Sequence, residues 1–209
     1  MTEKIGVLLA EDQAMVREAL AALLGLEPDI EVVARLGRGD EVLPAALALA
    51  GRDRAPDVAL LDIEMPGIDG LAAAALLHRE LPAVKIVILT TFGRPGFLRR
   101  AMEAGVSAFM VKDAPAAELA AAIRRVLAGE RVIDPALAAA ALADGINPLT
   151  QRERAVLQSS ADGSLNAEIA AELSLSEGTV RNYLSACIQK TGARNRAEAV
   201  RIAYEKGWI

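Results

Sequence analysis

The chain has 209 residues, of which 53% are hydrophobic and only 3% aromatic, so it can form one large domain or two small ones with aliphatic cores. Its net charge of -5 is unevenly distributed along the chain. Residues 146–209 hold 8 Lys and Arg against 7 Asp and Glu, which leaves 15 Lys and Arg against 21 Asp and Glu for residues 1–145. The acidic first part does not exclude nucleic acid as a partner, because the second part can carry the contacts. The single cysteine excludes an intrachain disulfide, and there is neither a signal-peptide pattern nor a run of 18 apolar residues, so we expect a soluble, cytoplasmic protein.

The first 130 residues alternate between short β-type runs and longer Ala- and Leu-rich stretches with helical spacing. The expected strands are Ile5–Ala10, Ile30–Leu36, Val58–Leu61, Lys85–Leu89 and Ala108–Val111. The expected helices are Ala14–Leu24, Asp40–Ala50, Leu71–Glu80, Phe97–Ala104 and Ala116–Ala128. Three of the strands are almost continuously apolar, as strands are when helices cover both faces of a parallel sheet. The pattern predicts an α/β fold of the (βα)5, flavodoxin-like kind, whereas a helical bundle would leave the β-branched runs unexplained.

The segment Gly129–Leu149 breaks this alternation, because two Gly and two Pro residues surround an Ala-rich stretch, Ala136–Ala143, that suits a short helix. We therefore expect a linker at residues 130–145, between a first domain of residues 1–129 and a second domain of residues 146–209.

The second domain is expected to be all-α, since strand patterns are missing from its sequence. Its four expected helices are Thr150–Ser160, Ala167–Leu173, Glu177–Thr191 and Asn195–Glu205. Thr150 and Glu153 have the spacing of a capping box, and Ser176 and Asn195 are expected to cap the helices that follow them.

Polar residues follow four of the expected strands. They are Glu11 and Asp12, Asp62, Thr90 and Thr91, and Lys112. Because ligands bind at the carboxyl ends of parallel strands, we expect these side chains at one edge of the sheet. Three adjacent carboxylates need a cation, and oxygen ligands suit Mg²⁺. A carboxylate beside Mg²⁺ can accept a phosphoryl group, whose oxygens Thr90 and Lys112 would hold.

Four stretches, LLAEDQAMVREAL, PDVALLDIEMPGIDGL, ILTTF and AGVSAFMVKD, resemble the receiver domains of bacterial response regulators. The resemblance implies that Asp62 is the phosphoacceptor and that Thr90 and Lys112 bind the phosphoryl group. It implies a Mg²⁺ site with four members: Glu11, Asp12, Asp62 and the backbone carbonyl of Glu64.

Two phenylalanines accompany this set. By the same resemblance, Phe109 occupies the place of an aromatic switch residue; it lacks a hydroxyl, so packing alone would drive its rearrangement. Phe92 lies two residues beyond Thr90, and our hypothesis is that its bulk slows hydrolysis of the acyl phosphate.

The stretch LNAEIAAELSLSEGTVRNYLSACIQKTGARNR has the pattern of a helix-turn-helix. Val180, Leu184 and Ile188 recur every four residues and are expected to bury one side of the second motif helix. The opposite side carries polar residues able to reach base edges or phosphates: Thr179, Arg181, Asn182 and Ser185. Taken alone, the pattern also fits an ordinary small α bundle with a solvated polar face.

Together with the segment that starts at PLTQRERAVLQ, this motif resembles the LuxR-type DNA-binding domain of the NarL/FixJ family of two-component response regulators. The resemblance implies contacts with double-stranded promoter DNA by Asn166, Ser176, Thr179, Arg181, Asn182 and Ser185. It also implies a dimer surface on the last helix. We therefore expect a transcription factor that a sensor histidine kinase phosphorylates and that binds DNA as a homodimer.

The stretches DIEMPG, TTFGRPGF, NPLTQRE, GTVRNY and EKGWI resemble the DesR-type branch of this family, which regulates fatty-acid desaturase genes downstream of a membrane thermosensor kinase. Phosphorylated receivers of that branch pair through their first and last helices. The resemblance implies a dimer face that includes Met15, Leu119 and Ile123, although some apolar residues of these helices must face the core, so burial is the alternative for each. It also implies control of membrane-lipid genes.

Two other functions compete with this interpretation. A Mg²⁺-dependent phosphatase with an Asp nucleophile would carry a D-x-D motif on its first strand and a cap domain, whereas Asp62-Ile63-Glu64 follows the third expected strand. A constitutive DNA binder that uses its first domain only to dimerise would not need the acidic set with Thr90 and Lys112. We therefore expect no enzyme activity beyond the phosphoryl transfer and dephosphorylation of the domain itself.

The remaining distinctive side chains have structural interpretations. Cys187 is expected to be a buried small hydrophobe, His78 a surface residue, and Trp208 a packing anchor near the C-terminus.

Overall fold

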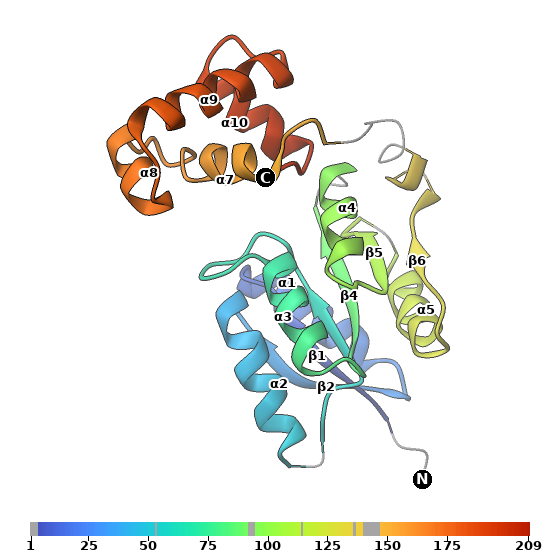
Figure 1. Ribbon diagram of the computed structural model, residues 1–209. Coiled ribbons are helices and arrows are strands. Elements are labelled where there is room, and N and C mark those ends of the chain that lie inside the picture. The colour runs from blue at the N-terminus through green and yellow to red at the C-terminus, as the bar shows by residue number, and fades with distance from the viewer. Residues whose placement is uncertain (1–3, 53, 92–94, 114, 136, 140–146) are drawn as a thin grey trace. The chain divides into compact units, whose positions relative to one another are not determined.

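A computed structural model of the chain describes residues 4–52, 54–91, 95–113, 115–135, 137–139 and 147–209 (Figure 1). The chain divides into two compact units. We call the first, which contains strands β1 to β6, the α/β unit, and the second, which contains helices α7 to α10, the helical unit. None of the helices in the described ranges is long and apolar enough to cross a membrane.

The α/β unit is built on a parallel six-stranded sheet with the order β2-β1-β3-β4-β5-β6. Its strands are β1 (Ile5–Ala10), β2 (Ile30–Leu36), β3 (Val58–Leu61), β4 (Lys85–Thr90), β5 (Ala108–Val111) and β6 (Val132–Ile133). Its helices are α1 (Ala14–Gly25), α2 (Val42–Ala50), α3 (Gly70–Glu80), α4 (Pro95–Glu103) and α5 (Ala116–Leu127), with a 3-10 turn at Gly39–Glu41. The predicted parallel α/β fold is thereby confirmed.

Helices cover both faces of the sheet. One core joins α1 and α5 to alternate strand residues, among them Val7, Leu60 and Val87. The intervening residues, such as Leu8 and Ile88, point to the opposite face and are also fully buried, and α2 and α3 contact each other there. This double coverage explains the nearly continuous apolar strands.

The bounds of several elements in this unit differ from the sequence prediction by one or two residues; α4, for example, runs from Pro95 to Glu103 and not from Phe97 to Ala104. β4 extends to Thr90, and the predicted helix Asp40–Ala50 begins as the 3-10 turn before α2. The segment predicted to be a linker starts with β6, which pairs with β5 through the Phe109–Ile133 register. Most of the Ala136–Ala143 stretch lies outside the described residues.

The helical unit contains α7 (Gln151–Gln158), α8 (Asn166–Leu173), α9 (Glu177–Thr191) and α10 (Arg196–Glu205). The predicted capping box is present at Thr150 and Glu153, and Ser176 and Asn195 cap α9 and α10 through bonds from backbone N–H groups. Between α8 and α9, Ser174 adopts the left-handed conformation with φ of 54° and turns the chain.

Three of the predicted burial states are confirmed. Cys187 is fully buried in the core of the helical unit, and burial raises the pKa of its thiol to about 11. Trp208 packs against the same core, and His78 of α3 is exposed.

Candidate functional site

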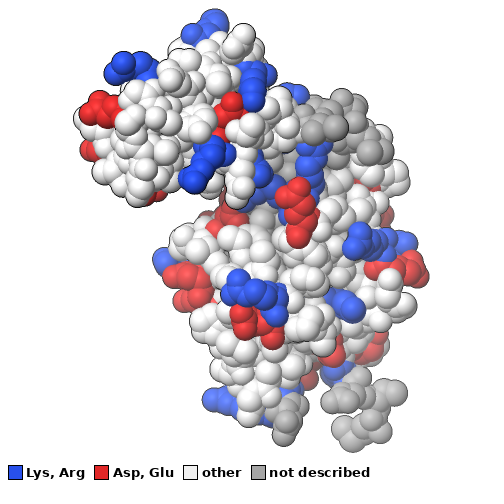
Figure 2. Space-filling model, in the orientation of Figure 1, with Lys and Arg blue, Asp and Glu red and all other residues white. Residues whose placement is uncertain are grey.

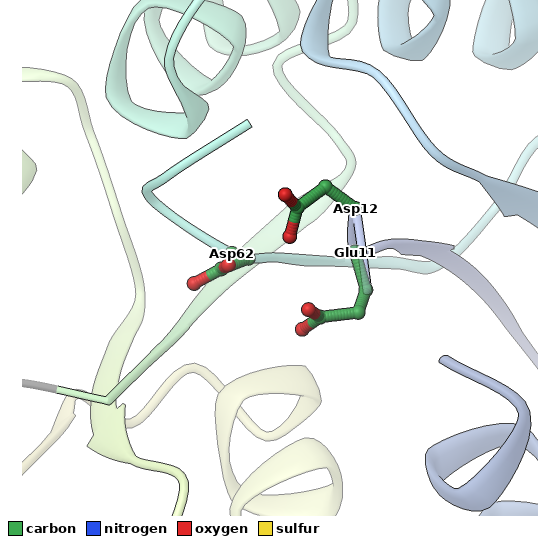
Figure 3. Close-up of side chains that lie close together, drawn as sticks. All are labelled: Glu11, Asp12 and Asp62. Atoms are coloured by element: carbon green, nitrogen blue, oxygen red, sulfur yellow. The ribbon is translucent and has the colours of Figure 1, made fainter. Parts of the chain in front are cut away.

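Three carboxylates meet at one edge of the sheet, as Figure 3 shows for Glu11, Asp12 and Asp62. One oxygen from each lies within 4.8 Å of the others. Glu11 and Asp62 are 1% and 6% exposed, whereas Asp12 is open to solvent. The edge therefore combines two buried acids with one accessible acid.

Strand register brings these residues together. Ala10, the last residue of β1, is paired with Leu61, the last residue of β3, so Glu11 and Asp62 both come directly after paired strand ends. The backbone N–H of Asp62 continues the ladder by donating to the carbonyl of Ala10 at 2.9 Å. Asp12 follows Glu11 in the turn that leads to α1.

Lys112 connects the two buried acids. It follows β5, where its backbone N–H donates to the carbonyl of Thr90 at 2.8 Å. Its Nζ lies 2.6 Å from Oε2 of Glu11 and 3.0 Å from Oδ2 of Asp62, and its side chain is 12% exposed. A single ammonium thus faces three carboxylates, which leaves the cluster with an excess of negative charge.

The pKa values of this pair reflect burial and mutual contact. Burial raises the pKa of the Asp62 carboxyl, against the opposing effect of the Lys112 hydrogen bond. For Lys112, burial alone would lower the pKa, but its bonds to Glu11 and Asp62 outweigh burial and raise it. The ammonium is therefore held in its charged form beside the acids.

The structure gives the bonds of Asp62 and the burial of the other residues predicted for this site. Oδ1 of Asp62 accepts a hydrogen bond from the N–H of Ile63 at 2.8 Å, and Oδ2 faces Lys112. Thr90 ends β4 and is 2% exposed, Glu64 is exposed in the segment after Asp62, and Phe109 of β5 is fully buried. Phe92 lies outside the described residues.

All the donors gathered here are oxygens, and Mg²⁺ prefers oxygen ligands, of which carboxylates and retained waters are the usual ones. The accessible Asp12 leaves room for such waters, and the excess negative charge of the cluster needs a cation. The residues present therefore fit Mg²⁺.

The structure adds one residue that sequence reasoning missed. Arg17, on the second turn of α1, donates from Nη1 to the backbone carbonyl of Glu11 at 2.6 Å. No motif signals such a bond, because its acceptor is a main-chain atom that every residue type carries.

The polar residues predicted for DNA contact lie on and around α9. Arg181, Asn182 and Ser185 are exposed, while Val180, Leu184 and Cys187 on the other side are buried. Thr179 and Asn166 are half-buried. Ser176 Oγ accepts from the N–H of Thr179 at 3.1 Å and lies 2.8 Å from the Thr179 hydroxyl, so these two side chains form one unit at the start of the helix.

Most cations of the helical unit have partners inside it. Lys190, Arg194 and Arg201 pair with Glu153, Glu198 and Glu205. Arg196 donates to the carbonyls of Ser160 and Ser164. Arg152, Arg154 and Arg181 form no ion pair with other described residues, and Figure 2 shows acidic and basic side chains interspersed on the visible face.

The predicted dimer face needs correction. Met15 of α1 is 86% exposed, but Leu119 and Ile123 of α5 are 5% and 0% exposed and belong to the core that packs α5 on the sheet. Their i, i+4 spacing marks the inward side of the helix, so they cannot form a surface. Two other large apolar side chains are exposed on this segment: Leu23 near the C-terminal end of α1, at 43%, and Leu26 directly after the helix, at 80%.

Comparison with known proteins gives a consistent result for both units. Residues 7–124 match the response regulator receiver domain, and residues 147–203 match the luxR family of bacterial regulatory proteins. Transcriptional regulatory protein DesR of Bacillus subtilis (strain 168) is 46% identical over 205 residues, which cover 98% of this chain and 99% of DesR.

Solved structures show the same arrangement of folds. The response regulator ChrA of a heme-sensing two-component system is 32% identical, with a TM-score of 0.57 over 99% of both chains. An RcsB–DNA complex has a TM-score of 0.65 at 21% identity, over 97% of this chain and 99% of that chain, which is a likeness of fold alone.

Proposed function

This chain belongs to the two-component response regulators that join a receiver domain to a LuxR-type DNA-binding domain, and we propose that phosphorylation of Asp62 controls its binding to promoter DNA. Members of the family are transcription factors rather than enzymes of metabolism. The observation that carries the proposal is the placement of Asp62, which is buried between Lys112 and the N–H of Ile63 beside two further acids.

In this proposal a carboxylate oxygen of Asp62 attacks the phosphorus atom of a phosphohistidine on a sensor histidine kinase. The new O–P bond makes Asp62 an acyl phosphate as the P–N bond breaks, and the histidine of the kinase leaves as an imidazole. Mg²⁺, held by Glu11, Asp12, Asp62 and the backbone carbonyl of Glu64, would offset the charge of the phosphoryl oxygens. Thr90 ends β4, the neighbour of β3, and Lys112 follows β5 with its Nζ 3.0 Å from Asp62, so their hydroxyl and ammonium would hold those oxygens.

Lys112 has a second task in this scheme. Its ammonium now bonds to Glu11 and Asp62, and a phosphoryl group on Asp62 offers it a stronger acceptor. Movement of Lys112 and Thr90 toward that group would disturb β4 and β5, and so the packing of Phe109, which we propose as the switch residue.

The output is proposed to be dimer formation on DNA. α9 would enter the major groove, with Thr179, Arg181, Asn182 and Ser185 toward the bases and Asn166 and Ser176 toward the backbone. In the described part of this unit, only Arg152, Arg154 and Arg181 lack both an ion pair and any other side-chain bond or ring contact, so one copy offers few cations to phosphates and binding by a monomer should be weak.

Dimerisation doubles the number of cations that can contact phosphates. We propose that α1 and the residue after it form part of the receiver dimer face, with the exposed side chains Met15, Leu23 and Leu26. From the resemblance of its motifs to the DesR-type branch we also propose a role in the control of membrane-lipid genes, with a membrane sensor kinase as the partner.

The test uses the full-length protein with Mg²⁺ and beryllofluoride, which mimics a phosphoryl group on Asp62. Sedimentation measures dimerisation, and selection from a random DNA library followed by binding assays measures recognition of the selected site. We expect beryllofluoride to promote both, Asp62→Asn to abolish both responses, and Arg181→Ala to remove DNA binding while dimerisation persists.

Asp162→Asn, which changes an exposed acid of the helical unit, is the matched control and should respond like the wild type. If Asp62→Asn also responds like the wild type, the switch is not at Asp62. If beryllofluoride changes neither dimerisation nor DNA binding, the protein is a constitutive DNA binder.

A further inference from the structure

Asp12 is the one acid of the metal cluster that has no hydrogen bond or ion pair with any of the described residues. One of its carboxylate oxygens nevertheless lies within 4.8 Å of oxygens of Glu11 and Asp62, close enough for all three acids to bind one metal ion. It is exposed and sits in the turn between β1 and α1. Its direction therefore depends on the orientation of the peptide that joins it to Glu11.

That peptide is fixed by a bond from α1. Nη1 of Arg17 donates to the carbonyl oxygen of Glu11 at 2.6 Å, and this carbonyl belongs to the peptide group that joins Glu11 to Asp12. A charged donor makes this a strong bond. Since a peptide group is planar, holding its oxygen restricts the rotation that would swing Asp12 away from the cluster.

The rest of Glu11 is anchored as well. Its backbone N–H donates to the carbonyl of Leu36 at the end of β2, at 3.0 Å, and its Oε1 accepts from the N–H of Gln13 at 3.2 Å. Nη1 of Arg17 would lie 3.3 Å from a Cβ at Gly37, so the guanidinium also packs against the end of β2. Glu11 is thereby tied on both sides: the Gln13 bond engages the peptide group that follows Asp12, and the Arg17 bond holds the peptide group that precedes Asp12.

Building on the proposed Mg²⁺ site, we propose that Arg17 is a positioning residue that orients Asp12 for the metal through the Glu11 carbonyl. Electrostatics alone makes the opposite prediction. Arg17 is a cation near three carboxylates, so its removal would make the site more negative and would tighten cation binding. The two effects differ in sign, which makes them separable by experiment.

The experiment measures Mg²⁺ affinity by calorimetric titration of the full-length protein, without any phosphoryl donor. Arg17→Met removes the donor but keeps an unbranched side chain that suits a helix, and we expect its dissociation constant for Mg²⁺ to rise about tenfold, as when a group that orients a metal ligand is lost. Arg17→Lys keeps the charge and one donor, so its affinity should lie between those of the wild type and Arg17→Met.

Arg35→Met is the matched control, because Arg35 donates to Glu18 of α1 at 2.7 Å in an exposed bridge and not to the Glu11 carbonyl. It should bind Mg²⁺ like the wild type. Thermal unfolding without Mg²⁺ should be similar for all variants, which would separate positioning from a general loss of fold.

Equal or tighter Mg²⁺ binding by Arg17→Met would overturn the positioning role, since charge alone would then govern the site. An Arg17→Met variant that unfolds at a much lower temperature, with no partial recovery of affinity in Arg17→Lys, would overturn it as well. Failure of the wild type to bind Mg²⁺ would instead refute the proposed metal site itself.

Discussion

Glu153 of α7 is the residue whose loss should most clearly destabilise the helical unit without altering the side chains proposed to face DNA. Its carboxylate accepts from Lys190 Nζ at 2.8 Å and 2.7 Å and from the N–H of Thr150 at 2.7 Å. Its side chain is 8% exposed. Glu153→Ala removes all of these bonds and leaves the Thr150 N–H and the Lys190 ammonium without this acceptor.

The expected cost follows from those contacts. A hydrogen bond to a charged group contributes about 1.5–3 kcal/mol, and a capping interaction about 1 kcal/mol. Solvent screens part of the ion pair, because the Lys190 side chain is 36% exposed. We therefore expect Glu153→Ala to lower the free energy of unfolding by about 2–3 kcal/mol, and Glu153→Gln by about 1 kcal/mol, since the amide oxygen can still accept from Thr150.

Trp208 provides the assay, because it is the single tryptophan of the chain and is 8% exposed in the core of the helical unit. Its fluorescence during urea denaturation reports on this unit. Glu205→Gln, which removes an exposed partner of Arg201, is the control and should change the free energy of unfolding by less than about 0.5 kcal/mol. A Glu153→Gln variant with the denaturation curve of the wild type would refute the reasoning.

The same residue predicts a pH dependence. Burial alone would raise the pKa of Glu153, but the bonds from Lys190 and Thr150 lower it below the ordinary value of 4.5. A carboxyl with a depressed pKa in the folded state adds stability above its unfolded pKa and loses it as the pH falls through the folded pKa. The difference between the wild type and Glu153→Gln should thus be constant near neutral pH and shrink below pH 4.5. A difference that grows on acidification would contradict this account.

Three further outcomes follow from the structure. A methyl group at Gly70 would overlap the backbone carbonyl of Asp62, so Gly70→Ala should unfold the receiver at lower temperature and slow phosphorylation by acetyl phosphate, and unchanged values of both would be contrary evidence. Ile123→Ser should destabilise the receiver by roughly 3 kcal/mol or more, because Ile123 is buried. Leu23→Ser should weaken phosphorylation-dependent dimerisation at nearly constant stability, because Leu23 is exposed. Weaker dimerisation at constant stability in Ile123→Ser would show instead that Ile123 belongs to the dimer surface. If Arg152, Arg154 and Arg181 supply the phosphate contacts of each copy, the logarithm of the dimer's DNA affinity should fall with the logarithm of salt concentration with a slope of about -5, and a slope near -10 would mean that further cations of the helical unit also contact phosphates.

Much of the site could be predicted because the topology of the sheet determines which residues become neighbours. Parallel strands end at a common edge, so the residues that follow β1, β3 and β5 had to be neighbours, and Glu11, Asp62 and Lys112 are in direct contact. Helix ends were predictable for a similar reason, since Thr150, Ser176 and Asn195 are short polar residues placed directly before helical patterns.

Other features could not be predicted in this way. β6 has two residues and no alternation of its own, and only its pairing with β5 makes it a strand. The bond from Arg17 ends on a main-chain oxygen, which leaves no mark in the sequence. The error at Leu119 and Ile123 had another origin: family resemblance suggested an outward role, whereas their spacing on α5 already indicated the inward side of the helix.

β6 also sets the length of the tether between the two domains. The chain stays hydrogen-bonded to the receiver sheet as far as Ile133, so the connection to the DNA-binding domain starts there rather than at residue 130. Fourteen peptide steps lead from Ile133 to Asn147, and a fully extended chain spans at most about 50 Å over that distance. Adjacent half-sites on DNA lie about 34 Å apart. In the proposed dimer, the upper limit of one tether therefore exceeds the separation of adjacent half-sites, so the length of the tether alone would not prevent two recognition helices from binding one operator.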